Sequence, residues 1–168
     1  MQYRLQQITE IQKLLESERR KREKLSSNYK KCVKAVKATE GVSLAVSFVG
    51  LSTVSGIFLS TVIASPAVTV IEAVSLGAGL LFIVGGFVSR RLILKAEKHH
   101  KIKLLADKKL NVISDLVSKA LDDETISDEE FSLVLSELDK FFDKKEKIRL
   151  EAKSSEKLLR LMYFDGIS

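Results

Sequence analysis

Apolar and polar residues are separated into three blocks along the chain. Residues 1–40 and 90–168 mix charged with apolar residues, whereas the 49 residues from Gly41 to Ser89 contain one charged residue, Glu72. A helix needs about 20 apolar residues to cross a bilayer, so the middle block is long enough to cross twice. The length of the uninterrupted apolar run argues against buried strands of a soluble sheet. We therefore expect the middle block to be a membrane segment.

The middle block divides at residues 64–67, which contain the single proline of the chain, Pro66. Proline favours the first turn of a helix and disfavours helical geometry at the residue before it. Each arm then has about 22 residues, or ~33 Å of helix, which matches the ~30 Å apolar core of a bilayer. The alternative is one long bent helix. We predict a two-helix transmembrane hairpin with its turn near 64–67.

The first block has the spacing of an amphipathic helix. Residues 3–39 contain no Pro or Gly, and apolar residues recur there at heptad positions. Glu18 and Arg22 interrupt the apolar face. We expect this helix to pack on a partner along most of its length. The face consists of Ile8, Ile11, Leu15, Leu25, Tyr29, Cys32 and Val36.

The last block predicts two helices separated by a break near 122–127. Ser127 is placed as the N-cap of the second helix, with Glu130 completing a capping box. Ile126 and Phe131 have the spacing of a hydrophobic staple. The whole chain is thus expected to form four or five helices and no strand. The apolar faces comprise Ala106, Leu110, Ile113, Val117 and Ala120 before the break, and Phe131, Val134, Leu138, Phe141, Ile148, Ala152, Leu159 and Met162 after it.

Positive charges flank the middle block on both sides, and the turn near 64–67 has no charge. Residues 1–40 carry a net charge of +6, and residues 90–168 carry +1. By the positive-inside rule we expect both termini to be cytoplasmic. We expect no cleavable signal peptide, because the first 40 residues are polar and charged. The same cations are expected to contact anionic lipid. They are Lys30, Lys31, Lys34, Lys37, Arg90, Arg91 and Lys95.

Small residues recur every four positions in both arms of the hairpin. In lipid, such rows allow helix backbones to approach closely. They either close the hairpin on itself or also serve as contact and lining positions between neighbouring subunits. The rows contain Ser52, Gly56, Ser60 and Ala64 in the first arm, and Ala73, Ser75, Gly77 and Gly79 in the second.

Glu72 is a candidate for an ion pathway. It lies six residues, or ~9 Å, inside the second arm when counted from Pro66. An ionisable residue at this depth is a functional hypothesis, and a ring of carboxylates in an oligomer would favour cations. The alternatives are that Glu72 reaches the headgroups or is protonated and hydrogen-bonded to a serine.

Other chemistry-bearing residues have simpler interpretations. The basic run 19–24 fits a solvated helix face or an anionic lipid surface better than nucleic acid. His99 and His100 point about 100° apart on a helix, which is unsuitable for a shared metal ion, so both are expected at the surface. Cys32 is expected in the helix contact, with palmitoylation as the alternative. We find no catalytic motif, and we expect no enzyme activity, metal or cofactor.

The hairpin also carries a recognisable set of short motifs: a Gly/Ser-rich first arm, Ala-Ser-Pro-Ala at 64–67, Ser-Leu-Gly-Ala-Gly-Leu at 75–80, and Gly85-Gly86. With these motifs it resembles the membrane-inserting region of the apolipoprotein L family over about 50 residues. The resemblance implies membrane insertion and pore or ion-channel activity. It carries no functional residue over to this chain.

The expected protein is all-α. It has an N-terminal amphipathic helix at 1–40, a two-pass membrane hairpin at 41–89 and cytoplasmic helices at 90–168, assembled as a homo-oligomeric bundle. The expected function is a homo-oligomeric pore or ion channel. The alternatives are a non-conducting membrane scaffold or remodelling protein, and a pore-forming toxin that is soluble before insertion. The expected partners are a lipid bilayer and further copies of the chain, with no nucleic acid or small-molecule substrate.

Overall fold

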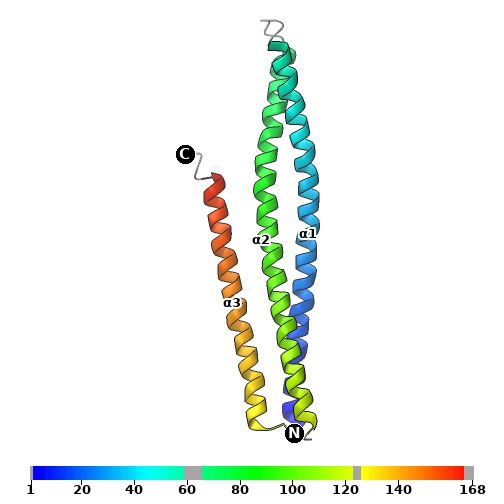
Figure 1. The fold of residues 1–168 in the computed structure, drawn as a ribbon, viewed down its shortest axis with the longest axis vertical. Helices are drawn as coiled ribbons and strands as arrows, with labels where there is room; N and C mark the ends of the chain where they lie inside the picture. Colours follow the sequence, from blue (N-terminus) through cyan, green and yellow to red (C-terminus); the bar gives the residue numbers. More distant parts are fainter. Residues whose placement is uncertain (1, 59–65, 123–125, 165–168) are drawn as a thin grey trace. The chain divides into compact units, whose positions relative to one another are not determined.

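The protein is all-α, as predicted. The computed structural model describes residues 2–58, 66–122 and 126–164, which form the helices α1 (Gln2–Phe58), α2 (Pro66–Asp122) and α3 (Asp128–Phe164) (Figure 1). Side chains are described for residues 3–38, 77, 83–119 and 126–164.

The described residues form three helices, so the prediction of four or five is wrong. No break separates the charged blocks from the apolar block: α1 continues through Gly41, and α2 continues through Ser89. A change in composition does not end a helix, and a single glycine costs only about 1 kcal/mol relative to alanine. The start of α2 at Pro66 agrees with the prediction.

The predicted capping box before α3 is confirmed. The Ser127 hydroxyl accepts a hydrogen bond from the Glu130 amide at 3.2 Å, and the Glu130 carboxylate accepts one from the Ser127 amide at 2.9 Å. These bonds satisfy two amides at the helix start. The hydrogen bonds that the carboxylate accepts from the Ser127 amide and hydroxyl lower the pKa of Glu130. Ile126 is buried, and Phe131 packs against the same hydrophobic cluster, as expected of a staple.

The chain divides into two compact units. The first consists of residues 1–29 and 94–166 with Ser168, and the second of residues 30–93 with Ile167. The first unit is a three-helix bundle, formed by the start of α1, the end of α2 and the whole of α3 (Figure 1). The second unit contains the remaining parts of α1 and α2. Within the described residues, we find no helical segment with the length and apolar character needed to cross a membrane.

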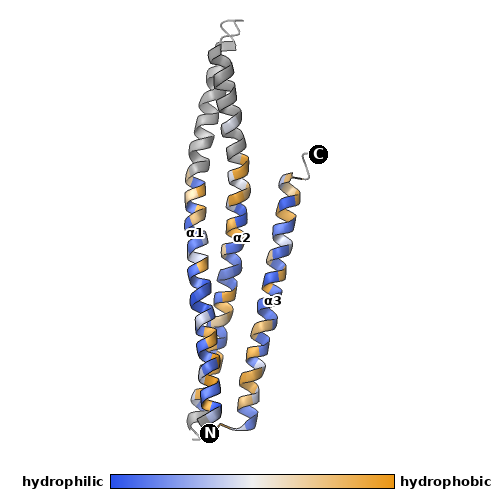
Figure 2. Ribbon diagram, turned by 180° about the vertical axis from the view of Figure 1, so that it is seen from behind, coloured by the Kyte–Doolittle hydropathy of each residue, from blue (hydrophilic) through white to orange (hydrophobic). Residues whose placement is uncertain are grey.

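The core of the bundle is built from the predicted apolar faces. Orange and blue positions alternate along α3 and along the coloured parts of α1 and α2, as expected of amphipathic helices with one buried face (Figure 2). The predicted faces therefore meet inside the bundle. The buried cluster consists of Ile8 and Leu15 from α1, Ala106 and Ile113 from α2, and Ile126, Val134 and Phe141 from the α3 region.

Two residues at the far ends of these faces are placed differently from the prediction. Cys32 is exposed, and Met162 is 72% exposed. Cys32 belongs to the second unit, whereas the buried part of the predicted α1 face belongs to the bundle. Met162 follows the buried Leu159 by three residues, near the end of α3.

Phe141 and Phe142 provide a matched test of this core. Phe141 is fully buried, whereas Phe142 is 43% exposed. We expect Phe141→Ala to lower the free energy of unfolding by about 3–5 kcal/mol, because it opens a cavity between three helices. Phe142→Ala is expected to cost about 1 kcal/mol or less. Chemical denaturation measures both, and equal losses would contradict the assigned core.

Candidate functional site

A layer of polar and charged side chains replaces the apolar core in the middle of the bundle. Arg22 from α1 and His99 from α2 are 8% and 6% exposed. The side chains of Glu18 from α1 and Lys145 from α3 are each 14% exposed. All three helices thus contribute to one buried polar layer, which consists of these four residues and Tyr29.

Glu18 is the acceptor at the centre of this polar layer. Its Oε1 accepts hydrogen bonds from Arg22 Nε at 2.8 Å and Arg22 Nη2 at 2.6 Å, and it lies 2.7 Å from Lys145 Nζ. Burial acts to raise the pKa of Glu18, but the hydrogen bonds from Lys145 and Arg22 outweigh it and leave the pKa below its ordinary value. The carboxylate is therefore ionised at neutral pH and connects α1 to α3.

His99 connects α2 to the same polar layer. Its Nδ1 lies 3.1 Å from Arg22 Nη1. Because a guanidinium can only donate, Nδ1 accepts this hydrogen bond and Nε2 carries the ring proton. The Tyr29 ring stacks on His99 with 5.6 Å between centroids. Burial, then the charges of Lys98 and Arg22, lower the pKa of His99 to about 4, so the ring is neutral at pH 7.

The prediction of a surface position is therefore wrong for His99, while His100 is exposed as expected. Heptad spacing could have shown that both His99 and Arg22 occupy buried positions. His99 precedes the buried Ala106 by seven residues, and Arg22 follows the buried Leu15 by seven. Residues seven apart lie on nearly the same helix face, so these side chains continue the buried face with polar groups.

A second ion pair joins α2 to α3, nearer the end of α2 and the start of α3 than the polar layer. Lys109 is 6% exposed and donates to Glu137, which also accepts a hydrogen bond from Lys140 at 2.7 Å. The hydrogen bonds from Lys109 and Lys140 lower the pKa of Glu137 to about 2. Between α1 and α2, the Ser26 hydroxyl donates to the carbonyl of Ala96 at 3.1 Å.

A groove runs between α2 and α3 beside the polar layer. Its larger part has a volume of about 420 Å³ and includes Lys98 and Lys101 from α2 and Glu151 from α3. A smaller part of about 210 Å³ shares Lys98 and is lined by further cations, Lys95 among them. We call the two parts together the α2–α3 groove. A groove of this size accommodates a small polar ligand.

The residues predicted to contact anionic lipid are well placed for solvent or lipid access. Lys30, Lys31, Lys34, Lys37 and Arg90 are exposed, and Arg91 is partly exposed. Lys95 is partly exposed and lies 6.0 Å from the centre of the Tyr29 ring. Lys95 belongs to the bundle unit, whereas the other six belong to the second unit.

Most of the residues predicted to line or close the hairpin lie outside the described side chains. Gly77 is exposed, and a Cβ there would meet no atom within 4 Å, so packing within one chain does not require glycine at this position. The others, whose side chains are not described, are Glu72, Ser52, Gly56, Ser60, Ala64, Ala73, Ser75 and Gly79. Cys32 is a free, exposed thiol, so the prediction that it is buried in a helix contact is wrong. Its palmitoylation stays a prediction.

The described side chains include no cluster of three or more His, Cys, Asp or Glu residues placed to hold a metal ion. What the arrangement can do is hold three helices in register through the polar layer and present a cationic groove. The side chains of the polar layer are engaged with one another, whereas the α2–α3 groove is open to a ligand.

Comparison with known proteins finds a viral relative of unknown function. The chain is 29% identical over 159 residues to uncharacterized protein 259R of Invertebrate iridescent virus 6. The match covers 95% of this chain and 51% of that protein, so the chain spans about half the length of the curated relative it matches. No protein-family model matches the chain. No solved structure matches it either.

His99 predicts a pH dependence of stability. Its pKa is about 4 in the folded protein and 6.5 in the unfolded chain, so the unfolded chain binds more protons between these values. Stability is therefore highest above pH 6.5 and falls by about 3 kcal/mol as the pH drops towards 4. Denaturation at several pH values measures this slope. His99→Gln should flatten the slope of stability against pH between pH 6.5 and 5. His100→Gln changes an exposed residue and should retain the slope. A slope unchanged by His99→Gln would contradict a buried neutral histidine.

Glu18 offers a second test, with Glu16 as its matched control. Glu18→Gln removes the charge that compensates Arg22 and Lys145, and breaking a buried pair in this way costs about 3–5 kcal/mol. The Glu16 side chain is 41% exposed and pairs with Arg20 at the surface. Glu16→Gln is expected to cost less than about 1 kcal/mol. Similar unfolding free energies for the two variants would show that Glu18 is not buried in a charge network.

Proposed function

We propose that the chain is a membrane protein that inserts the hairpin at 41–89 and assembles with copies of itself into a pore or ion channel. The observation that carries this proposal is the 49-residue block with its single charged residue, Glu72. Residues 41–58 of the block belong to α1 and residues 66–89 to α2. Helices suit this role because they satisfy their own backbone hydrogen bonds in lipid.

The cations beside the block support an orientation in the membrane. Lys30, Lys34 and Lys37 precede it along α1, and Arg90 follows it on α2. Lysines and arginines next to a membrane segment favour the cytoplasmic side and attract anionic headgroups at about 1 kcal/mol each. Both termini would then lie in the cytoplasm, and only the turn would reach the opposite side.

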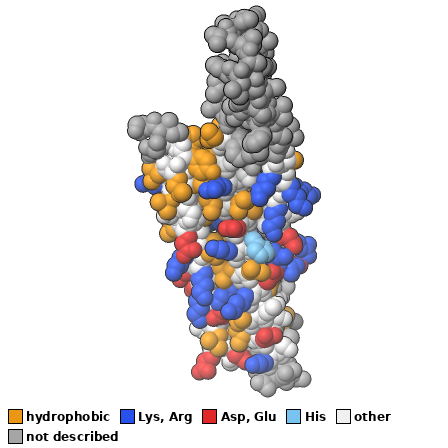
Figure 3. Space-filling view, turned by 45° about the horizontal axis from the view of Figure 1, so that its top comes forward, with side chains coloured by type: hydrophobic (Ala, Val, Ile, Leu, Met, Phe, Trp, Pro, Cys, Tyr) orange, Lys and Arg blue, Asp and Glu red, His pale blue; other side chains and the backbone are white. Residues whose placement is uncertain are grey.

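Apolar side chains left exposed on α3 support assembly with further copies. Hydrophobic side chains gather towards the C-terminal end of α3 (Figure 3). Contiguous apolar patches on a soluble surface mark contact sites, and a second copy of the chain would cover this one. The exposed residues there are Leu150, Leu158, Leu161, Met162 and Phe164.

Ion selectivity tests the channel directly. The purified chain, reconstituted in a planar bilayer, is expected to show discrete conductance steps that favour cations. Glu72→Gln should reduce the cation preference, because it removes a ring of carboxylates from the pathway. Glu40→Gln removes a carboxylate just outside the block and should leave selectivity unchanged. Unaltered selectivity in Glu72→Gln would rule out the carboxylate ring.

The alternative functions give different outcomes in the same preparation. A scaffold would form oligomers and deform liposomes without conducting ions. A toxin that is soluble before insertion would purify as a monomer without detergent. Either result would contradict a constitutive channel.

A further inference from the structure

The smaller part of the α2–α3 groove is lined by more cations than carboxylates. Its smaller part is lined by four cationic residues, and Glu156 is the one carboxylate among its lining residues. Glu156 lies 3.9 Å from the Arg160 guanidinium, on the α3 side of the groove. The cations are Lys95 and Lys98 from α2 and Arg149 and Lys153 from α3.

Lys98 is the cation most affected by this crowding. It lines both parts of the groove and is partly buried. Burial, followed by the charges of Arg22 and Lys95, lowers the pKa of Lys98 below its ordinary value. An anion in the groove would relieve this repulsion and replace the lost hydration with charge-assisted hydrogen bonds.

Arg149 adds a directional donor to the same wall. Its Nη1 donates to Glu146 at 3.3 Å on the exposed side of α3. A guanidinium carries five N–H donors, so the others are available to a ligand. Arginine binds phosphate oxygens through two parallel hydrogen bonds, whereas lysine contributes a point charge.

The larger part of the groove has a different chemistry. It is lined by Glu97 and Glu151 together with the hydroxyl of Ser154. The carboxylates can accept hydrogen bonds from the hydroxyl groups of a polyol, and the serine hydroxyl can accept or donate them. The two parts together thus suit a ligand with a phosphate at one end and several hydroxyl groups at the other.

We propose that the α2–α3 groove binds the phosphate group of a phosphorylated polyol lipid headgroup. The net positive charge in the smaller part favours a doubly charged phosphate monoester over the singly charged phosphodiester that links the headgroup of an ordinary phospholipid. The lipid source rests on the membrane function proposed above. Lys95, the first cation of the smaller part, follows Ser89, the last residue of the apolar block, by six residues, or ~9 Å along α2. That separation matches the distance from apolar core to headgroup.

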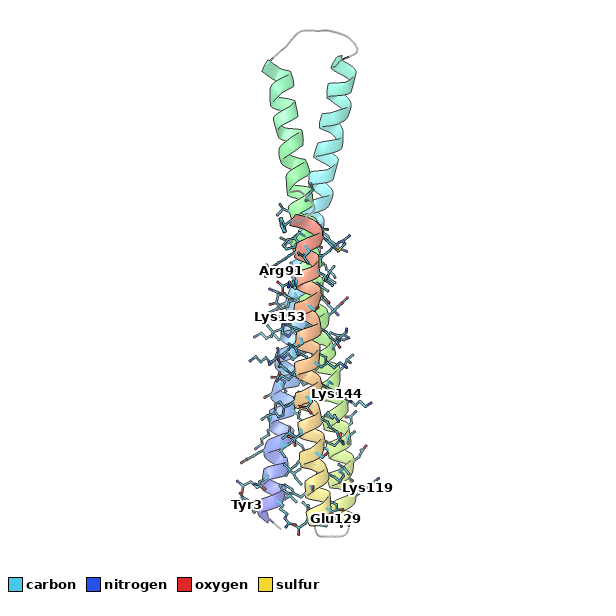
Figure 4. All side chains as sticks on the ribbon, turned by 90° about the vertical axis from the view of Figure 1, so that its left-hand side faces the viewer. Tyr3, Arg91, Lys119, Glu129, Lys144 and Lys153 are labelled. Atoms are coloured by element: carbon cyan, nitrogen blue, oxygen red, sulfur yellow. The ribbon has the colours of Figure 1, made fainter. Side chains whose placement is uncertain are left out.

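The test compares two double variants of the full-length chain. Lys98→Gln with Arg149→Gln removes one cation from each wall of the groove. Lys108→Gln with Lys144→Gln removes the same charge from exposed positions of α2 and α3 outside the groove. Figure 4 shows Lys144 nearer the start of α3 than Lys153, which lines the groove. Helix content and thermal midpoint verify that both variants are folded.

Binding is measured to phosphatidylcholine vesicles containing phosphatidylinositol bisphosphate, and to vesicles of equal charge containing phosphatidylserine. The groove variant should bind the phosphoinositide vesicles about tenfold more weakly or worse, because it loses a charge-assisted hydrogen bond from each wall of the groove. The control variant should change by about twofold or less. Equal weakening in both variants, or equal affinity for the two vesicle types, would overturn the proposal.

A soluble inositol phosphate distinguishes a failure of the groove proposal from a failure of the proposed membrane function. It should bind the unmodified chain and compete with the vesicles. If the chain neither conducts nor inserts but its groove still binds the soluble phosphate, then the lipid source is overturned together with the channel. If the chain conducts and the groove variants bind every probe as the unmodified chain does, then the groove proposal fails and the channel stands.

Discussion

The arrangement of the bundle depends on one buried carboxylate, that of Glu18. It joins α1 to α3 through Lys145 at 2.7 Å, and through Arg22 it holds the contact to His99 of α2. Removing charges from water costs several kcal/mol per ion unless they are paired. A shift of any helix by one turn would separate these partners and leave a charge buried alone. The polar layer therefore favours one register of the three helices, while the apolar cluster beside it supplies most of the packing.

That register also creates the groove that we propose as a binding site. Lys98 precedes His99 on α2, so the contact that fixes His99 in the bundle also fixes the neighbouring lysine at the groove. On α3, Lys145 and Arg149 are four residues apart and lie on the same helix face. The ion pair of Lys145 with Glu18 thus positions Arg149 across from Lys98. Stability and ligand recognition share these two helix segments.

Local signals in the sequence predicted local structure well. The start of α2 at Pro66, the capping box at Ser127 and most of the apolar faces follow from rules that act within one or two helical turns. Heptad spacing could have shown that Arg22 and His99 are buried, but it could not have identified the partners in the polar layer. Those partners are separated by up to 127 residues and meet only once the helices pair in one register. Charged residues on an apolar heptad face were interpreted as an interruption, whereas they continue the buried face. Helices α1 and α2 continue through the predicted domain boundaries at 40 and 89, because a change from charged to apolar residues does not by itself end a helix.

The membrane hairpin is the central claim, and thiol labelling tests it most directly. Cys32 is the only cysteine in the chain and is exposed, so a membrane-impermeant maleimide reports the side on which it lies. In a Cys32→Ser background, Ser65→Cys places the only thiol in the turn between the two arms. In sealed vesicles of one orientation, we predict that Cys32 and the thiol at position 65 are labelled from opposite sides of the membrane. Labelling of both from the same side would contradict the hairpin.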